Sequence, residues 1–419
     1  MRLHLAPTDK FKTVAVKLFW RSDLSAERAT ETALLPYVLR HGTRSLPSMQ
    51  AISETCEQLF GASLGVDVLK LGESQVLTAR LETIGDAFLP EGEGVFDRGL
   101  GLLLDLFQDP LQEGGALTAS ATAQEQAKLE RFIQSLINDK ATYAVETCVR
   151  HMCADEPYGV FEYGRLEDLP GIDGARLEAR RQALLAEAPL DVYVVGAFDP
   201  ARAEAVLRER LSLGRARVPA LRGTTGHPAP QPVRELREPM AVSQGKLCMG
   251  LRSEIRVEDP DYWALLLANG ILGAFPHSKL FKNVREKAGL CYDASSNLER
   301  FKGLVLIHAG IDRDKFEQTR DMCLEQVAAL ARGEISEGEL IATRLSYQQG
   351  LESLLDSPSG LVNLDYALRL GGREGQPGLV ISELARVDPA AIAQAAEQLR
   401  LDTVYFLEPT AEPAAEEAA

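Results

Sequence analysis

Two parts of the chain repeat the same order of apolar and polar positions. In the first part, the apolar run at residues 14–20 predicts a strand, and a polar turn leads to an apolar helical stretch over 29–40. In the second part, the run at 247–252 is followed by a polar turn and a helical stretch over 262–272. A strand–helix plan that occurs twice predicts two α+β domains related by duplication.

Further elements extend both parts. An amphipathic helix is predicted over 48–60, and the alternating runs 64–71 and 75–84 predict a hairpin that turns at Gly72. The other predicted elements are helices over 99–107, 123–153, 315–331 and 336–355, a strand over 303–311, and closing strands over 191–196 and 402–407.

The segment 218–235 is rich in Pro, Gly and Thr and lacks a sustained apolar period, which is typical of a linker. It separates an N-terminal domain, predicted at 1–217, from a C-terminal domain, predicted at 236–408. The final residues 409–419 are acidic and nearly free of large apolar side chains, so we expect a disordered tail.

Length, net charge, apolar runs and cysteine content exclude several classes of protein. The 419 residues exceed the roughly 250–300 that one core supports, which agrees with two domains. A net charge of −16 argues against nucleic acid or an anionic membrane as the main partner. Residues 1–10 hold no signal-like apolar run, and no stretch reaches the roughly 20 apolar residues of a membrane span. With six scattered cysteines, this favours a cytoplasmic protein with reduced thiols.

Residues 37–41 read YVLRH and end the first helical stretch. Together with the helix and hairpin that follow, this segment resembles the inverzincin peptidases, which include insulinase, pitrilysin and the mitochondrial processing peptidase. Their first half carries H-x-x-E-H on a helix. Two His at i and i+4 bind zinc, the Glu acts as general base, and a Glu from a later helix completes the site.

Only His41 of that motif is present. Tyr37 stands in place of the first His, and a phenol with an ordinary pKa of about 10 is a poor zinc ligand. Arg40 replaces the base, and its fixed charge repels a dication. The resemblance aligns Phe132 with the third ligand, and a shifted register would bring Glu130 there instead. The prediction is a chain without a metal of its own, in which His41 is structural or on the surface.

The run LFKNVREKAGLCY over 280–292 is similar to the second-half signature of the same family, L-F-x-x-V-R-E-K-x-G-L-x-Y. The resemblance implies that Arg285 and Tyr292 correspond to the pair that reaches substrate beside the zinc in active members. An Arg suits a substrate carbonyl, and a Tyr hydroxyl suits a developing oxyanion. The alternative is that Arg285 pairs with an acid such as Glu286 and that Tyr292 is a packed aromatic.

The resemblance covers about residues 11–407 and departs at the metal motif. It implies two mostly antiparallel sheets, each with helices on one face, that form half of a clamshell chamber. It also implies a non-zinc subunit of a heterodimeric metallopeptidase, similar to the zinc-less chain of bacterial paired proteases and the α-subunit of the mitochondrial processing peptidase. The partner would hold the zinc, and the substrates would be extended peptides or small unfolded proteins.

Other functions stay open beside this one. The chain could be a non-enzymatic peptide-binding or scaffold homodimer, or, as the least favoured hypothesis, a self-sufficient peptidase with unorthodox ligands. Cys148, His151 and Cys153 lie close in sequence but do not share one helical face, which favours a structural role. His277 and Lys279 suit either a substrate contact or a helix entry.

Overall fold

A computed structural model describes residues 1–90, 93–211, 218, 220–226 and 232–410. Most of the expected tail and parts of the expected linker lie outside the described residues. The chain forms two compact units. Unit 1 comprises Met1–Gln134, Val160–Gly223 and Ser357–Asn363, and unit 2 comprises Ser135–Gly159, Thr224–Asp356 and Leu364–Ala419.

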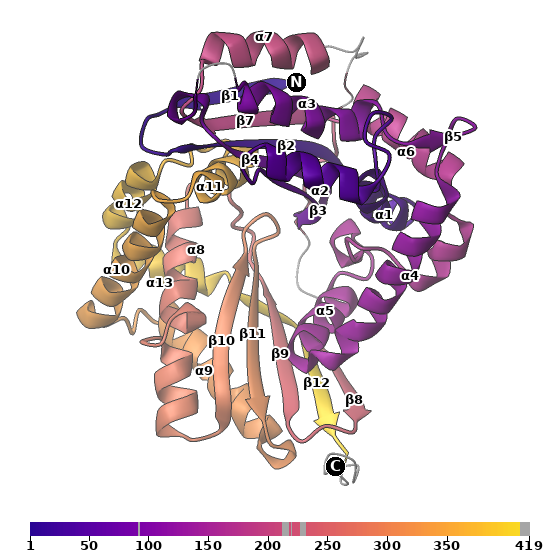
Figure 1. Ribbon diagram of the computed structural model, residues 1–419. Coiled ribbons are helices and arrows are strands. Elements are labelled where there is room, and N and C mark those ends of the chain that lie inside the picture. The colour runs from indigo at the N-terminus through magenta and orange to yellow at the C-terminus, as the bar shows by residue number, and fades with distance from the viewer. Residues whose placement is uncertain (91–92, 212–217, 219, 227–231, 411–419) are drawn as a thin grey trace, which may run out of the picture. The chain divides into compact units, whose positions relative to one another are not determined.

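Unit 1 is built on a five-stranded sheet in the order β1-β7-β2-β4-β3 (Figure 1). Strands β1 and β7 are parallel, and the other neighbours are antiparallel. The strands are β1 Arg2–Pro7, β2 Thr13–Asp23, β3 Ser63–Leu71, β4 Ser74–Ile84 and β7 Leu190–Gly196. The predicted hairpin is therefore the β3–β4 pair, and β3 forms an edge of the sheet.

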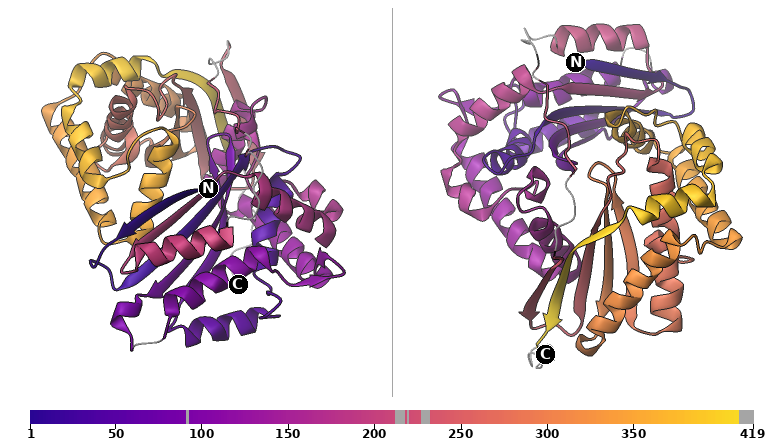
Figure 2. Two further views of the ribbon diagram at one scale, coloured as in Figure 1. Left: turned by 90° about the horizontal axis from the view of Figure 1, so that it is seen from above. Right: turned by 180° about the vertical axis from the view of Figure 1, so that it is seen from behind.

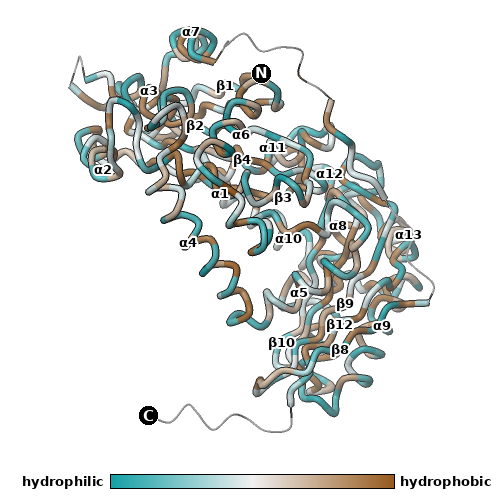
Figure 3. The backbone as a smooth tube through the Cα atoms, turned by 90° about the vertical axis from the view of Figure 1, so that its right-hand side faces the viewer, coloured by the Kyte–Doolittle hydropathy of each residue, from teal (hydrophilic) through white to brown (hydrophobic). Residues whose placement is uncertain are grey.

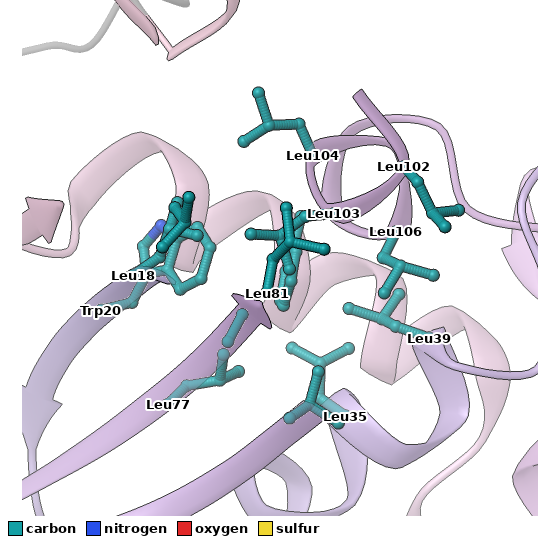
Figure 4. Close-up of a cluster of buried hydrophobic side chains, with 14 of the residues drawn as sticks. Leu18, Trp20, Leu35, Leu39, Leu77, Leu81, Leu102, Leu103, Leu104 and Leu106 are labelled. Atoms are coloured by element: carbon teal, nitrogen blue, oxygen red, sulfur yellow. The ribbon is translucent and has the colours of Figure 1, made fainter. Parts of the chain in front are cut away.

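Helices cover one face of this sheet. Alternate residues of β2, such as Val16, Leu18 and Trp20, point into a leucine-rich core beneath them. Figure 4 shows Leu35 and Leu39 of the first helix in the same buried cluster as Leu81 of β4. The helices are α1 Ala29–Leu39, α2 Met49–Gln58, α3 Val95–Gln108, α4 Ala119–Ser135, α6 Gly174–Glu187 and α7 Pro200–Leu211, and short strands β5 Gln112–Glu113 and β6 Ala116–Leu117 form a ribbon.

Unit 2 repeats the plan of unit 1. Its sheet has the order β8-β12-β9-β11-β10, in which β8 and β12 are parallel and the other neighbours antiparallel. The strands are β8 Arg234–Met240, β9 Gly245–Arg252, β10 Cys291–Glu299, β11 Leu304–Ile311 and β12 Arg400–Pro409. Each strand of unit 1 thus has a counterpart at the same place in unit 2. The prediction of two related, mostly antiparallel α+β domains is confirmed.

The helices of unit 2 lie mainly on one face of its sheet (Figure 2). Phe406 of β12 contacts Phe316 on that face, with ring centroids 4.8 Å apart. The helices are α5 Lys140–Met152, α8 Tyr262–Asn269, α9 Phe316–Ala331, α10 Glu337–Leu354, α12 Pro377–Arg386 and α13 Pro389–Glu397, with π-helical turns at Gly270–Ala274 and Leu280–Lys287. Helix α11, Pro358–Leu370, is divided, because its residues up to Asn363 fall in unit 1. Among the described helices, none has the length and apolar character needed to cross a membrane.

Helix α5 comes from the first half of the sequence but packs in unit 2. Its Cys148 is buried with Cys248 of β9 and Tyr405 of β12, on the face opposite to α9. The helical stretch predicted over 123–153 is interrupted between α4 and α5, where the Asp139 side chain accepts from the backbone N–H groups of Ala141 and Thr142. This N-cap starts a new helix and lets the chain leave unit 1. Brown and teal stretches alternate along α4 (Figure 3), as expected for a helix with one buried face.

Buried ion pairs hold the segment after α5 against the second sheet. Glu156 lies 2.6 Å from both Arg252 of β9 and Lys302, and Arg252 lies 2.5 Å from Asp402 of β12. All four side chains are buried. Burial raises the pKa of Glu156, but the hydrogen bonds from Lys302 and Arg252 outweigh that effect and lower it. Glu156 is therefore a charged residue of the unit 2 core.

Candidate functional site

The degenerate metal motif lies at the end of α1. Pro36 lies inside the helix, yet the helical hydrogen bonding resumes at once, since the Arg40 N–H donates to the Pro36 carbonyl at 3.3 Å. Tyr37 and His41 therefore stand one turn apart, as the two His of an intact motif do. Each side chain reaches a different carboxylate.

His41 contacts Glu125, which α4 supplies. Its Nε2 lies 2.7 Å from Glu125 Oε1, and Lys128 Nζ lies 2.5 Å from the same oxygen. His41 and Glu125 are only 14% and 8% exposed, so water screens their pairing weakly. His41 is therefore a largely buried, hydrogen-bonded residue that joins α1 to α4.

Tyr37 points to the open edge of the sheet. Its hydroxyl donates to Asp67 Oδ1 of β3 at 3.0 Å, and the hydroxyl of Tyr163 donates to the same oxygen at 3.3 Å. Burial, reinforced by the Asp67 charge, raises the pKa of Tyr37 and raises that of Tyr163 to about 12. Both phenols thus stay protonated at neutral pH and act as donors.

The remaining positions of the motif offer no further metal ligand. Phe132 of α4 is 40% exposed, and its ring packs edge-on against Tyr163 with centroids 4.9 Å apart. Glu130 accepts from Gln134 on the exposed side of α4. Arg40 lies near Cys56, whose pKa burial raises and the Arg40 charge lowers in part. The three residues predicted at motif positions besides His41 thus supply two aromatic rings and a cation.

The residues that are present do not fit a catalytic zinc. Within the described residues, no group of three or more His, Cys, Asp or Glu side chains is placed to hold a metal ion. His41 and Glu125 would supply two ligands, whereas a catalytic zinc takes three from the protein. Sequence reasoning missed Glu125. It lies two helical turns before Phe132, and that spacing was the available signal.

Arg285 and Tyr292 lie in a different environment, within unit 2. Arg285 is exposed on the π-helix Leu280–Lys287, and its guanidinium lies 4.3 Å from the ring centroid of Phe281. Tyr292 is 68% exposed on the edge strand β10, at a bulge where the pairing with β11 shifts between Cys291 and Asp293. A bulge turns a side chain out of the regular pleat.

The positions of Arg285 and Tyr292 bear on the alternative in which Arg285 pairs with an acid such as Glu286 and Tyr292 packs in the core. Among the described residues, no ion pair links Arg285 to Glu286, and Tyr292 lies outside the core. Both groups are free to contact a molecule outside unit 2. The Phe281 ring is a partner of the Arg285 guanidinium within unit 2, whereas Tyr292 stays 68% exposed.

Two other candidates have structural partners. His277 Nε2 lies 2.9 Å from Thr343 Oγ1, and Lys279 forms a largely buried ion pair with Glu339 at 3.0 Å, so both fasten their loop to α10. Cys148 and Cys153 are buried in unit 2, and burial raises the pKa of Cys153 to about 12. His151 is exposed nearby, and these three residues form no metal site.

Comparison with known proteins agrees with this geometry. The model of the Peptidase M16 inactive domain matches residues 173–347. The Bacillus subtilis (strain 168) protein named "Probable inactive metalloprotease YmfF" is 33% identical over 407 residues, which is 97% of this chain and 95% of that protein. The chain belongs to the M16, or insulinase, family of peptidases.

Solved structures share the M16 fold along nearly the whole chain. A conserved protein from Enterococcus faecalis V583 is 27% identical with a TM-score of 0.90, covering 98% of this chain and 96% of its own. A peptidase M16 inactive domain from Pseudomonas fluorescens is 20% identical with a TM-score of 0.77, covering 97% and 96%. Together with the lost ligands and base, these similarities make this chain a catalytically incomplete M16 homologue.

Proposed function

We propose that this chain is the non-zinc subunit of a heterodimeric M16 metallopeptidase. The partner supplies the zinc and the intact H-x-x-E-H motif, and this chain supplies Arg285 and Tyr292. The observation that carries the proposal is the 68% exposure of Tyr292 on an edge strand, directly after Leu290 and Cys291, which are buried. A fold that has lost its own metal ligands has no internal use for an exposed Arg–Tyr pair.

The chemistry of the pair suits catalysis in trans. The guanidinium of Arg285 carries fixed donors for a substrate carbonyl. The hydroxyl of Tyr292 can donate to the oxyanion that forms when a zinc-activated water attacks a peptide carbonyl. Zinc supplies that activation when the partner's site is loaded. The two side chains of this subunit would bind and orient the substrate and stabilise developing charge.

Substrates would be peptides or small unfolded proteins in an extended conformation. Strands β3 and β10 are each at the edge of a described sheet, and a peptide can add to such an edge through backbone hydrogen bonds. Tyr292 itself is on β10. Backbone pairing tolerates many sequences, which favours a broad range of peptides.

The test is reconstitution with the product of a neighbouring gene that encodes H-x-x-E-H. We expect the two chains to co-purify, to hold one zinc per heterodimer and to cleave an unstructured peptide, while this chain alone holds no stoichiometric zinc and cleaves nothing. One tight zinc in this chain alone, or chelator-sensitive cleavage by it, would overturn the proposal. A peptide-binding homodimer without any zinc-bearing partner would instead support the scaffold function.

A further inference from the structure

Arg285 is exposed, yet one contact restricts the direction of its side chain. The guanidinium lies over the ring of Phe281, 4.3 Å from the ring centroid. Among the described residues, no carboxylate forms an ion pair with Arg285, although Glu286 follows it directly in the sequence. The half-buried aromatic ring is therefore the partner that unit 2 provides for this cation.

The π-helix Leu280–Lys287, which carries the ring and the guanidinium, is firmly attached to unit 2. Leu280 and Val284 are buried completely. On a neighbouring side of the helix, Asn283 Nδ2 donates to Gln326 Oε1 of α9 at 2.6 Å. The aromatic residue and the arginine each follow one of the two buried residues, so they lie next to each other about one turn apart. The base of the ring is thus fixed before any substrate is present.

Contact with the ring orients the guanidinium without using its hydrogen-bond donors. An aromatic face attracts a cation that lies above it. The five N–H donors of a guanidinium lie in its own plane, and they can still form paired hydrogen bonds with an oxygen acceptor. An ion pair with Glu286 would have used the same donors. Phe281 therefore restrains Arg285 and leaves it able to bind a substrate.

The charge of Arg285 lies near the start of β10. Burial and the Asp293 charge raise the pKa of Cys291 to about 11. The positive charges of Arg285 and Lys315 oppose this rise, so both lie near Cys291. Lys315 is ion-paired with a neighbouring aspartate at 2.7 Å, whereas Arg285 has no such partner in the described structure. Because Tyr292 directly follows Cys291, the cation without a carboxylate lies near the proposed oxyanion donor.

We propose that Phe281 is a positioning residue, which holds the Arg285 guanidinium with its donors available to a substrate carbonyl. The inference rests on the proposed function and adds a residue to it. An arginine side chain loses much rotamer freedom when it binds. Because the ring restricts that freedom in advance, less is lost when the substrate arrives. The effect of Phe281 on the reaction therefore passes through Arg285.

The first experiment tests the contact in the full-length chain alone. Nitrogen-15 labelling of arginine gives an Nε–H resonance for Arg285, which is identified by its absence in Arg285→Lys. The ring current of Phe281 should place this resonance upfield. It should move downfield in Phe281→Leu and stay in place in Phe281→Tyr, which keeps the ring. An unchanged resonance in Phe281→Leu overturns the contact and the inference with it.

The second experiment measures peptide cleavage by the reconstituted heterodimer. Phe281→Leu should lower kcat/KM by about two- to fivefold, as loss of an exposed cation–π contact predicts. Phe281→Tyr should stay within about twofold of wild type, because its ring presents the same face. Phe11→Leu is the matched control. It removes a similar contact in unit 1, where Lys10 Nζ lies 5.7 Å from the ring centroid, and it should leave kcat/KM unchanged.

A double-variant cycle separates positioning from a purely structural role. In an Arg285→Ala background, Phe281→Leu should cause no further loss of kcat/KM, because the group that it positions is gone. A loss of the same size in both backgrounds, or wild-type kcat/KM in Phe281→Leu, overturns the role. A wild-type heterodimer that cleaves no peptide overturns the proposed function instead, and the resonance of Arg285 still decides whether the contact exists. If Phe281→Leu fails to fold, Phe281→Met takes its place, since it fills a similar volume without a ring.

Discussion

Two groups of polar residues in this molecule have opposite environments. Around the degenerate motif of unit 1 and in the buried ion pairs of unit 2, each charged or phenolic group has a partner within its own unit. Arg285 and Tyr292 lie exposed on unit 2, where the Arg285 guanidinium packs on the Phe281 ring and forms no ion pair with a described carboxylate. The first group is explained by folding, whereas the exposure of the second group leaves it available to a molecule outside the unit, as proposed above.

The difference shows how the family fold can lose a metal site without collapse. Tyr37, which aligns with the first His, donates to Asp67, and Phe132, predicted at the third ligand position, packs on Tyr163 while Glu125 contacts His41. The site has become part of the packing of unit 1. No equivalent replacement has removed Arg285 or Tyr292, so substitutions in the two groups should separate stability from activity.

The largest effect is expected at Glu156, within the group that has partners. Glu156→Ala would leave Lys302 and Arg252 buried with reduced charge compensation, and breaking a buried ion pair typically costs about 3–5 kcal/mol. The free energy of unfolding in urea measures this loss. Glu254→Ala, at an exposed position after β9, is the control and should change stability by less than about 0.5 kcal/mol. Similar values for the two variants would contradict a structural role for the pairs.

The second prediction concerns Tyr292, which belongs to the exposed group on unit 2. In the reconstituted heterodimer, Tyr292→Phe should slow turnover by about 10²–10³, because a donor aimed at an oxyanion stabilises the transition state by roughly 3–4 kcal/mol. Peptide binding should weaken much less, since the hydroxyl acts mainly in the transition state. The unfolding free energy should stay unchanged, because the side chain is 68% exposed. Arg285→Ala should weaken both binding and turnover.

Wild-type turnover by both the Tyr292 and the Arg285 variants would place these residues outside catalysis. The subunit would then contribute no catalytic group, and the scaffold function would be favoured over the catalytic one. Loss of stability in Tyr292→Phe would break the comparison differently, because Tyr292 would then belong with the residues that serve the fold.

Lys17 of β2 gives the third prediction, which depends on pH. Its side chain is 8% exposed, and its Nζ donates to Asn363 Oδ1 and to the Ser359 carbonyl. Folding lowers its pKa from 10.5 to about 8, so between pH 8 and 10.5 the unfolded chain holds more protons than the folded one. Stability attributable to Lys17 therefore rises with pH across this window, by on the order of 3 kcal/mol in total. The charged groups that act on Lys17 are Arg80, which lowers its pKa, and Glu82, which raises it, whereas its hydrogen-bond acceptors on Ser359 and Asn363 are neutral.

The unfolding free energies of wild type and Lys17→Met, compared at pH 7.5 and 10.5, isolate this effect from other titrating groups. Wild type should gain relative to the variant at high pH. A flat difference would mean that folding does not lower the pKa of Lys17.

The sequence predicted the fold well where the apolar pattern is strong. The core strands β2, β4, β9 and β11 and the duplication all follow from periodicity. Strands β1 and β8 were missed because each mixes charged and apolar residues and lies at a sheet edge. The helical spacing of apolar residues in α5 indicates a buried face, but this spacing does not show which of the two sheets the face packs against.

For the candidate site, the sequence was enough to align Tyr37, Arg40 and His41 with the metal motif, because that motif spans only five consecutive residues. The contacts that Tyr37 and His41 make in place of a metal could not be predicted from the sequence. Glu125 and Asp67 come from α4 and β3, and only tertiary packing brings them to α1. The exposure of Tyr292 depends on a bulge, which one strand's sequence does not specify.

The smallest effect, and the finest test of the comparison, is expected at Tyr37. Tyr37→Phe removes one donor to Asp67 and should cost about 0.5–1.5 kcal/mol of stability, the net value of a typical hydrogen bond. Tyr163→Phe is the matched variant, since its hydroxyl donates to the same oxygen. Because the two phenols share one acceptor, the double variant should depart from additivity by at least about 0.5 kcal/mol. A Tyr37→Phe protein as stable as wild type, with additive behaviour in the double variant, would show that Tyr37 contributes no more to folding than Tyr292 does. The loss of the metal site would then lack the structural compensation inferred from the Tyr37–Asp67–Tyr163 contacts.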